Sequence, residues 1–139
     1  IYEGTSQLQV VAAINAVTKG TFMEQIGRYA AGDYCAEMQP VVERLKALTA
    51  KFAEMVDRVE TLDKQAPGFK DLHARRLVET AGHIIVTYLL ARQTGERADY
   101  GRSARVFCNL AEGKIAEAHA CVMGSEAGDV ALYRVETAE

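Results

Sequence analysis

The sequence predicts an all-α fold, an up-and-down antiparallel helical bundle. Three observations lead to this prediction. Apolar residues recur at intervals of three and four over long segments, and no segment shows the period-two alternation of a strand. The only prolines, Pro40 and Pro67, flank the longest of these segments. The loops between the long segments are short, which makes neighbouring helices antiparallel.

Two shorter helices are expected at the start of the chain. The first covers about residues 6–17 and the second about residues 21–31. Gly20 and Gly32 follow these two segments and separate each from the next element. Thr5 or Ser6 could serve as the N-cap of the first helix, because a hydroxyl oxygen accepts hydrogen bonds from free backbone N–H groups.

The longest helix is predicted by a regular seam of apolar residues. Such a seam over more than three heptads requires a helix of about 26 residues, roughly 39 Å long. Pro40 is tolerated in the first turn, where its missing N–H would have no partner anyway. Ala66, Pro67 and Gly68 then end the helix. The seam consists of Met38, Val41, Leu45, Leu48, Phe52, Met55, Val59 and Leu62.

A second long helix is expected over residues 69–94. Its apolar stripe is broad, which is typical of a helix that contacts more than one neighbour. Gly95 ends this helix, and Asp99 is a suitable N-cap for the next one. One row of the stripe is Leu77, Ala81, Ile84, Tyr88 and Ala91, and Val78, Ile85 and Leu89 widen it.

The third long helix is expected over residues 100–123. Gly113, Ala116, Ala120 and Cys121 are small and permit close approach of another helix. Gly124 and Gly128 mark the end of this helix and the start of a loose tail. The residues expected to face inward are Ala104, Phe107, Ala111, Ile115, Ala118 and Val122.

The seam allows two interpretations. It could form the core of a single chain, or it could form an intermolecular coiled coil. The broad stripe of the second long helix and the small residues of the third favour the intramolecular core, because both are suited to receive the seam.

Composition excludes several classes of function. The chain has 139 residues, enough for one domain, and its net charge of −3 does not suit a nucleic-acid surface. The longest strongly apolar stretch, residues 83–91, is far shorter than the roughly 20 residues that span a bilayer. Three scattered cysteines, Cys35, Cys108 and Cys121, argue against a disulfide framework and fit a reducing compartment.

Few residues outside the opening segment suggest chemistry. No two of His73, His83 and His119 have the spacing of a zinc site, and no metal site is expected. Glu79 and His83 are four residues apart, which indicates a surface hydrogen bond or ion pair rather than a metal site. Arg75–Arg76 and the group Arg97, Arg102 and Arg105 could contact a phosphate, but nearby acidic residues favour a solvated face of mixed charge.

The opening segment carries the one specific motif. Residues 1–9 read Ile-Tyr-Glu-Gly-Thr-Ser-Gln-Leu-Gln and precede an amphipathic helix. This segment resembles the end of the catalytic domain in acyl-CoA dehydrogenases. Many relatives carry a basic residue where this chain has Val10, so the contact made by that residue is not expected here. More than 100 residues follow the motif, as in the larger members with an added C-terminal helical domain.

The resemblance implies a function and a set of residues. Glu3 is the expected catalytic base, which removes the proton alpha to the thioester of an acyl-CoA. Gly4 allows close approach of the substrate, and Thr5 and Gln7 contact FAD, which takes the hydride. Residues 1–20 then belong to the end of the catalytic domain and residues 21–139 form the added bundle.

The chain is expected to be the C-terminal piece of such an enzyme, because it opens with Ile1 in the middle of the motif. On its own it should be inactive and should not bind FAD. The parent would form a homo-oligomer, pass electrons to an electron-transfer flavoprotein, and reside in the bacterial cytoplasm or the mitochondrial matrix. The alternative is a non-catalytic helical module for interaction or oligomerisation.

Overall fold

The described part of the chain is made of helices. The computed structural model describes residues 13–17 and 19–135, with side chains up to residue 132, and these residues form no strand. Residues 13–17 are helical, and six further elements follow. They are α2 (Thr21–Ala30), a 3-10 turn (Ala36–Met38), α3 (Gln39–Gln65), α4 (Phe69–Gln93), α5 (Asp99–Gly124) and α6 (Asp129–Val135).

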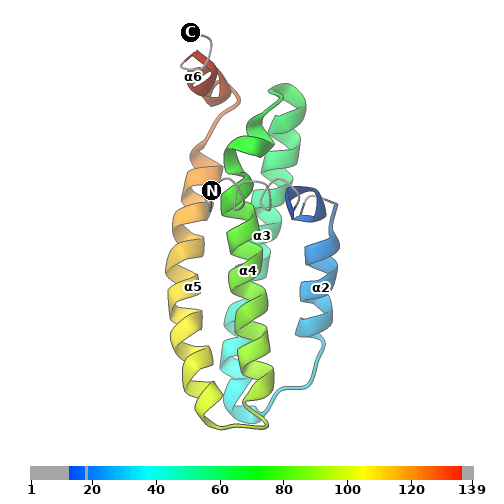
Figure 1. Cartoon of the computed structure of the whole chain (residues 1–139), viewed down its shortest axis with the longest axis vertical. Helices are drawn as coiled ribbons and strands as arrows, with labels where there is room; N and C mark the ends of the chain where they lie inside the picture. Colours follow the sequence, from blue (N-terminus) through cyan, green and yellow to red (C-terminus); the bar gives the residue numbers. More distant parts are fainter. Residues whose placement is uncertain (1–12, 18, 136–139) are drawn as a thin grey trace, which may run out of the picture.

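The four helices α2 to α5 lie along one common axis and alternate in direction (Figure 1). Helices α3, α4 and α5 each pack against the other two, and α2 packs on α3 and α4. Figure 1 shows α2 and α5 on opposite sides of α4. The expected all-α, up-and-down antiparallel bundle is therefore confirmed.

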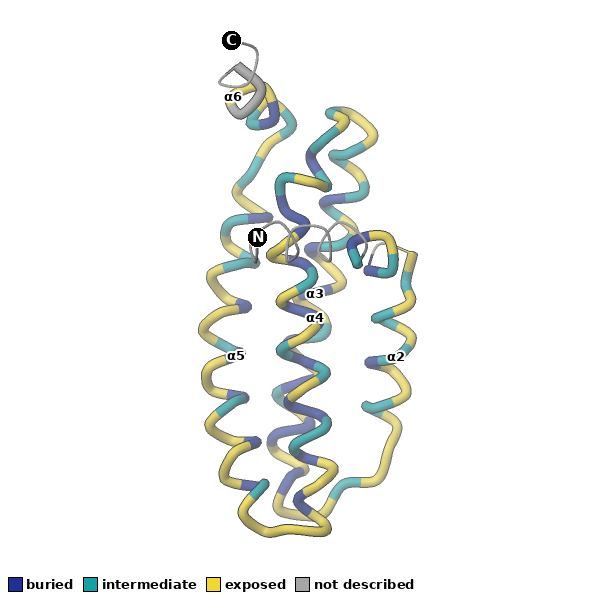
Figure 2. The backbone as a smooth tube through the Cα atoms, in the orientation of Figure 1, coloured by how far each residue is buried: buried dark blue, intermediate teal, exposed yellow. Residues whose placement is uncertain are grey.

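The seam of α3 forms the centre of this bundle. Seven of its eight residues, from Met38 to Val59, are 3% exposed or less, and Leu62 at the far end is half-buried. Their neighbours in the core come from the other helices of the same chain. The intramolecular interpretation of the seam is confirmed, and Figure 2 shows buried residues running along the inner sides of α3 and α4.

Helix α4 buries the predicted row from Leu77 to Ala91, but its inner face also carries polar residues. Thr80, Thr87 and Thr94 recur every seven residues and are all buried. Each hydroxyl donates to the backbone carbonyl four residues earlier, at distances of 2.7, 2.7 and 3.0 Å. The helix therefore satisfies these hydroxyls locally, and their methyl groups remain available for packing.

Helix α5 approaches its neighbours closely because its inner residues are small. Ala104, Cys108 and Ala111 are fully buried, and Gly101 faces Thr94. A Cβ atom at Gly101 would lie 3.0 Å from Cγ2 of Thr94 and 3.4 Å from Cε of Met38. A side chain there would therefore force the first turn of α5 away from α4 and from the start of α3.

The ends of the helices differ in part from the prediction. Pro40 lies in the first turn of α3, as expected. Asp99 is not the N-cap of α5: it is the first residue of the helix, Ala98 precedes it without a side-chain cap, and the Asp99 carboxylate binds Arg97 instead. The tail is not loose throughout, because residues 129–135 form α6, whose start is stabilised by a hydrogen bond from the Glu126 N–H to the Asp129 carboxylate.

The turn between α3 and α4 depends on Gly68 and Asp63. Gly68 has φ 106°, a left-handed conformation that glycine adopts without strain. The Asp63 carboxylate accepts hydrogen bonds from the backbone N–H groups of Gly68 and Lys70. Asp63 belongs to α3, and its carboxylate thereby provides an acceptor for backbone N–H groups at the start of α4 that have no partner within that helix.

Candidate functional site

The motif residues Glu3, Gly4, Thr5 and Gln7 lie outside the described residues. The described chain begins at Ala13, and two residues of its first helical segment, Ile14 and Val17, are buried in the same core as the seam. The stretch that carries the motif is thus joined to a segment that is packed into the bundle. The roles expected for the four motif residues stay predictions.

A surface groove lies between α4 and α5. Its volume is about 460 Å³, and its walls are mainly charged and polar. Formal charges of both signs line it, so it has no strong preference for an anion or a cation. The residues that line it are Asp71, Leu72, Arg75, Arg76, Glu79, Thr80, His83, Lys114, Ile115, Glu117 and Ala118.

Glu79 and His83, predicted to meet on one face of a helix, do interact. The imidazole Nδ1 of His83 donates to the Glu79 backbone carbonyl at 2.6 Å, and the Glu79 carboxylate lies 3.6 Å from the Arg75 guanidinium. The His83 ring stacks against Phe107 of α5. Across the described ranges, no three His, Cys, Asp or Glu side chains are placed to hold a metal ion.

The arginines singled out from the sequence lie on a surface of mixed charge. Arg97 binds Asp99 at 3.1 Å, and Arg105 binds Glu37 at the start of the bundle. Arg102 is exposed and forms no ion pair with any residue that the structure describes. This arrangement agrees with the solvated mixed-charge face and offers no converging set of donors for a phosphate group.

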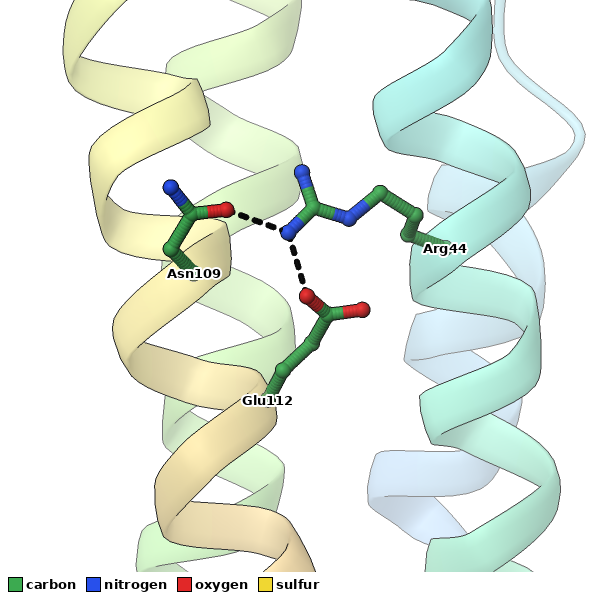
Figure 3. A network of polar contacts seen from close by, with 3 residues as sticks. All are labelled: Arg44, Asn109 and Glu112. Atoms are coloured by element: carbon green, nitrogen blue, oxygen red, sulfur yellow. Dashed lines mark hydrogen bonds and ion pairs between the residues drawn. The ribbon is translucent and has the colours of Figure 1, made fainter.

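One network of charged and polar side chains connects α3 to α5 (Figure 3). The Arg44 guanidinium donates to the Asn109 amide oxygen and to the Glu112 carboxylate. The hydrogen bond from Arg44 holds the pKa of Glu112 below its usual range, and the same bond raises the pKa of Arg44. Asn109 and Glu112 are 65 and 68 residues from Arg44 in the sequence, so this contact links α3 and α5 in the register at which the two helices pack.

His73 is the one imidazole buried in the core of the described chain. It is 2% exposed and packs on the Phe69 ring, with centroids 4.8 Å apart. Its Nδ1 lies 3.5 Å from the Arg76 guanidinium, which can only donate, so a hydrogen bond between them requires the tautomer with the ring proton on Nε2. That Nε2 has no hydrogen-bond partner, and burial lowers the pKa of His73.

Burial also makes other reactive side chains inert. Cys108 is fully buried, and burial raises the pKa of its thiol. Tyr88 is fully buried between Tyr29 and Tyr34, and burial raises the pKa of its hydroxyl to about 12. These residues are packing elements of the core. The bundle, in its described part, brings no nucleophile into contact with a general base.

The comparisons with known proteins address the bundle directly. The family described as "Acyl-CoA dehydrogenase C terminal" matches residues 18–130. A solved structure, the acyl-CoA dehydrogenase family protein from Porphyromonas gingivalis, is similar with a TM-score of 0.75 and 25% sequence identity. That similarity covers 83% of this chain and 98% of the other. No curated protein shows a significant match.

Proposed function

Because the chain belongs to the acyl-CoA dehydrogenase C-terminal family, we propose that it is the C-terminal part of an FAD-dependent acyl-CoA dehydrogenase. One observation carries the proposal. The segment Tyr2-Glu3-Gly4-Thr5 precedes the region that the family covers, residues 18–130, and is separated from it by residues 6–17. The motif and the bundle are separate stretches of sequence, and both lead to the same family.

In this proposal Glu3 is the general base of the parent enzyme. Its carboxylate takes the proton alpha to the thioester, and Gly4 leaves space for the thioester because it has no side chain. The hydroxyl of Thr5 and the amide of Gln7 are suited to hydrogen-bond FAD. FAD, when bound, accepts the hydride from the beta carbon.

We also propose that the domain boundary lies near residue 20 and that the bundle, residues 21–139, does not itself hold FAD. The groove between α4 and α5 is lined by charges of both signs, and the inner faces of the helices are packed against one another. The described residues therefore do not fit an isoalloxazine ring, which needs an apolar slot with a few placed polar groups. Acyl-CoA and an electron-transfer flavoprotein are partners of the parent in this proposal.

The compartment proposed for the parent is reducing, either the bacterial cytoplasm or the mitochondrial matrix. Cys35, Cys108 and Cys121 are all free thiols. None of the helices in the described part is both long and apolar enough to cross a membrane.

The decisive experiment replaces Glu3 in the full-length parent. Glu3→Gln keeps the size and hydrogen-bonding capacity of the side chain but removes the base. We expect acyl-CoA dehydrogenation to fall by at least about 10²-fold, since loss of a general base typically costs 10² to 10⁴ in rate. The absorbance of bound FAD should persist. The matched control is Glu96→Gln, an isosteric change at an exposed residue, and near-normal turnover in Glu3→Gln would remove Glu3 from the mechanism.

A flavin titration of the 139-residue chain tests whether the bundle is incomplete on its own. We expect high helicity by circular dichroism and no quenching of FAD fluorescence. Stoichiometric binding of FAD by this chain would contradict the proposal that the cofactor site is built by the rest of the parent enzyme.

A second function, a non-catalytic module for helical interaction or oligomerisation, is favoured by one observation. Val106 and Leu110 of α5 are exposed by 63% and 50%. The two functions are distinguished by the Glu3→Gln parent, because a non-catalytic module predicts no effect of that change on dehydrogenation.

A further inference from the structure

The buried imidazole of His73 has no part in the proposed catalysis and is poorly satisfied in the core. It is 2% exposed, its ring packs on Phe69, and its Nε2 atom has no hydrogen-bond partner among the described residues. Two charged groups act on it: Arg76 of α4 disfavours a positive charge on the ring, and Asp129 of α6 favours one. Burial has the largest effect, so the site accepts the neutral imidazole and opposes the imidazolium.

The other ionisable side chains at this end of the bundle are engaged elsewhere. Arg58 of α3 donates to a backbone carbonyl at 2.8 Å, and the Asp63 carboxylate accepts from backbone N–H groups at the start of α4. His119 of α5 lies 2.8 Å from a carboxylate of α3, and the Asp129 carboxylate accepts from a backbone N–H at the start of α6. Water is therefore the partner that would stabilise a protonated His73.

Helix α6 lies at the end of the bundle that contains His73. Residues 125–128 join it to α5, and Figure 1 shows it beyond the end of α5, at the same end as the turn between α3 and α4. Its Val130 is 9% exposed and belongs to the apolar core, whose members at this end include Phe69. The electrostatic effect of Asp129 on His73 agrees with this placement. Helix α6 therefore covers the part of the core in which the imidazole is buried.

The attachment of α6 is weak compared with that of the long helices. It has seven residues, and among the described helices none packs extensively on it. The chain before it is held at Ser125, whose backbone carbonyl accepts from Arg58. Gly128, directly before α6, is exposed, and a Cβ atom there would meet nothing within 4 Å. A short peripheral element opens at a much lower free energy than the whole bundle unfolds, so α6 is the element that can move away from His73 most easily.

We infer that α6 is an acid-sensitive cover: protonation of His73 detaches α6 from the end of the bundle while α3, α4 and α5 stay packed. Detachment exposes the imidazole to water, where its pKa returns to about 6.5. The open form therefore binds more protons than the closed form below that pH, and the ratio of open to closed chains rises by up to about tenfold per pH unit. Above that pH the ratio is constant. This inference does not depend on the proposed catalytic function.

The first experiment follows α6 with a single tryptophan, because the chain contains none of its own. Leu132→Trp places the fluorophore on α6 at a position that is 68% exposed, and Val106→Trp is the matched control on α5, at 63%. Fluorescence anisotropy of the whole chain is recorded from about pH 7.5 to about pH 5.0, above the usual pKa of carboxyl groups. We expect the anisotropy of Leu132→Trp to fall below about pH 6.5. That of Val106→Trp and the far-UV circular dichroism should stay constant.

The second experiment identifies the group responsible, in the Leu132→Trp chain. His73→Leu removes the ionisable group and should abolish the fall in anisotropy, whereas His83→Leu, at a half-buried imidazole of the same helix, should leave it unchanged. Val130→Ala keeps His73 but weakens the closed form, so it should move the fall to higher pH even if His73→Leu does not fold.

Four results would overturn the inference. The anisotropy of Leu132→Trp could stay constant over the whole pH range, or it could fall only together with the helical circular dichroism signal, which would indicate unfolding of the bundle. The fall could persist unchanged in His73→Leu. Finally, the pH of the fall could be the same with and without Val130→Ala.

Discussion

Leu48→Ala tests whether the seam of α3 stabilises the bundle as its burial indicates. Leu48 is 3% exposed and lies between Leu45 and Phe52, both fully buried, on the inner side of α3. The substitution removes apolar contacts and leaves a cavity that rigid neighbours cannot fill. Substitutions of this kind cost about 2–5 kcal/mol. We expect the upper half of that range, because the neighbouring side chains come from several packed helices.

The expected change in melting temperature follows from chain length. An unfolding entropy of about 2.1 cal/mol/K per residue gives about 0.3 kcal/mol/K for 139 residues. The upper half of the range, a loss of about 3.5–5 kcal/mol, therefore lowers Tm by about 12–17 °C. Urea unfolding followed by circular dichroism gives the free energy of unfolding independently.

The matched control is Leu132→Ala, the same substitution at a side chain that is 68% exposed. It should change the free energy of unfolding by no more than about 0.5 kcal/mol. Equal effects of the two substitutions would refute the reasoning, because Leu48 would then contribute no more than a solvent-facing leucine. A Tm of the unmodified chain that rose steeply with concentration would instead point to a seam shared between chains.

Two further predictions concern ionisable groups. Burial lowers the pKa of His73 from its usual 6.5, so the unfolded chain binds more protons than the folded chain below about pH 6.5. The stability that neutral His73 contributes is therefore fully present above that pH and is lost as the pH decreases. Urea unfolding at a series of pH values measures this loss, and His73→Leu should make the free energy of unfolding less dependent on pH. An unchanged pH dependence in His73→Leu would contradict the prediction. A double-mutant cycle on Arg44→Ala and Glu112→Ala should give a coupling of up to about 1 kcal/mol, because both side chains are partly exposed, and high salt should reduce it.

The long helices could be predicted from the sequence because their apolar residues repeat with a fixed period. Each residue of the seam from Met38 to Val59 is buried, and helix ends near Pro40 and Gly68 follow from backbone chemistry. Burial of His73 could also have been found, since it stands four residues after Phe69 and four before Leu77 on the inner face of α4. The spacing of the apolar residues assigns this position to the core, but histidine is polar and was therefore not counted among them.

Other features depend on contacts that no local pattern contains. Arg44 meets Glu112 only after α3 and α5 have packed in one particular register. Asp99 has the chemistry of an N-cap, but Arg97 competes for its carboxylate, and α5 begins one residue earlier than expected. Helix α6 has only seven residues, too few for an apolar period to stand out from the glycines before it.

The bundle and the motif are connected by a short stretch of chain, which has a consequence for the proposed enzyme. Ile14 and Val17 are buried in the same core cluster as residues of α2 to α5, so packing fixes the position where the chain leaves the bundle. Glu3 precedes Ile14 by only 11 residues. A flavin site requires its groups to be held to within about half an ångström by supporting residues. In the proposed parent enzyme, we therefore expect the packing of Ile14 and Val17 to belong to that support, with the bundle holding one end of the segment that carries the proposed base.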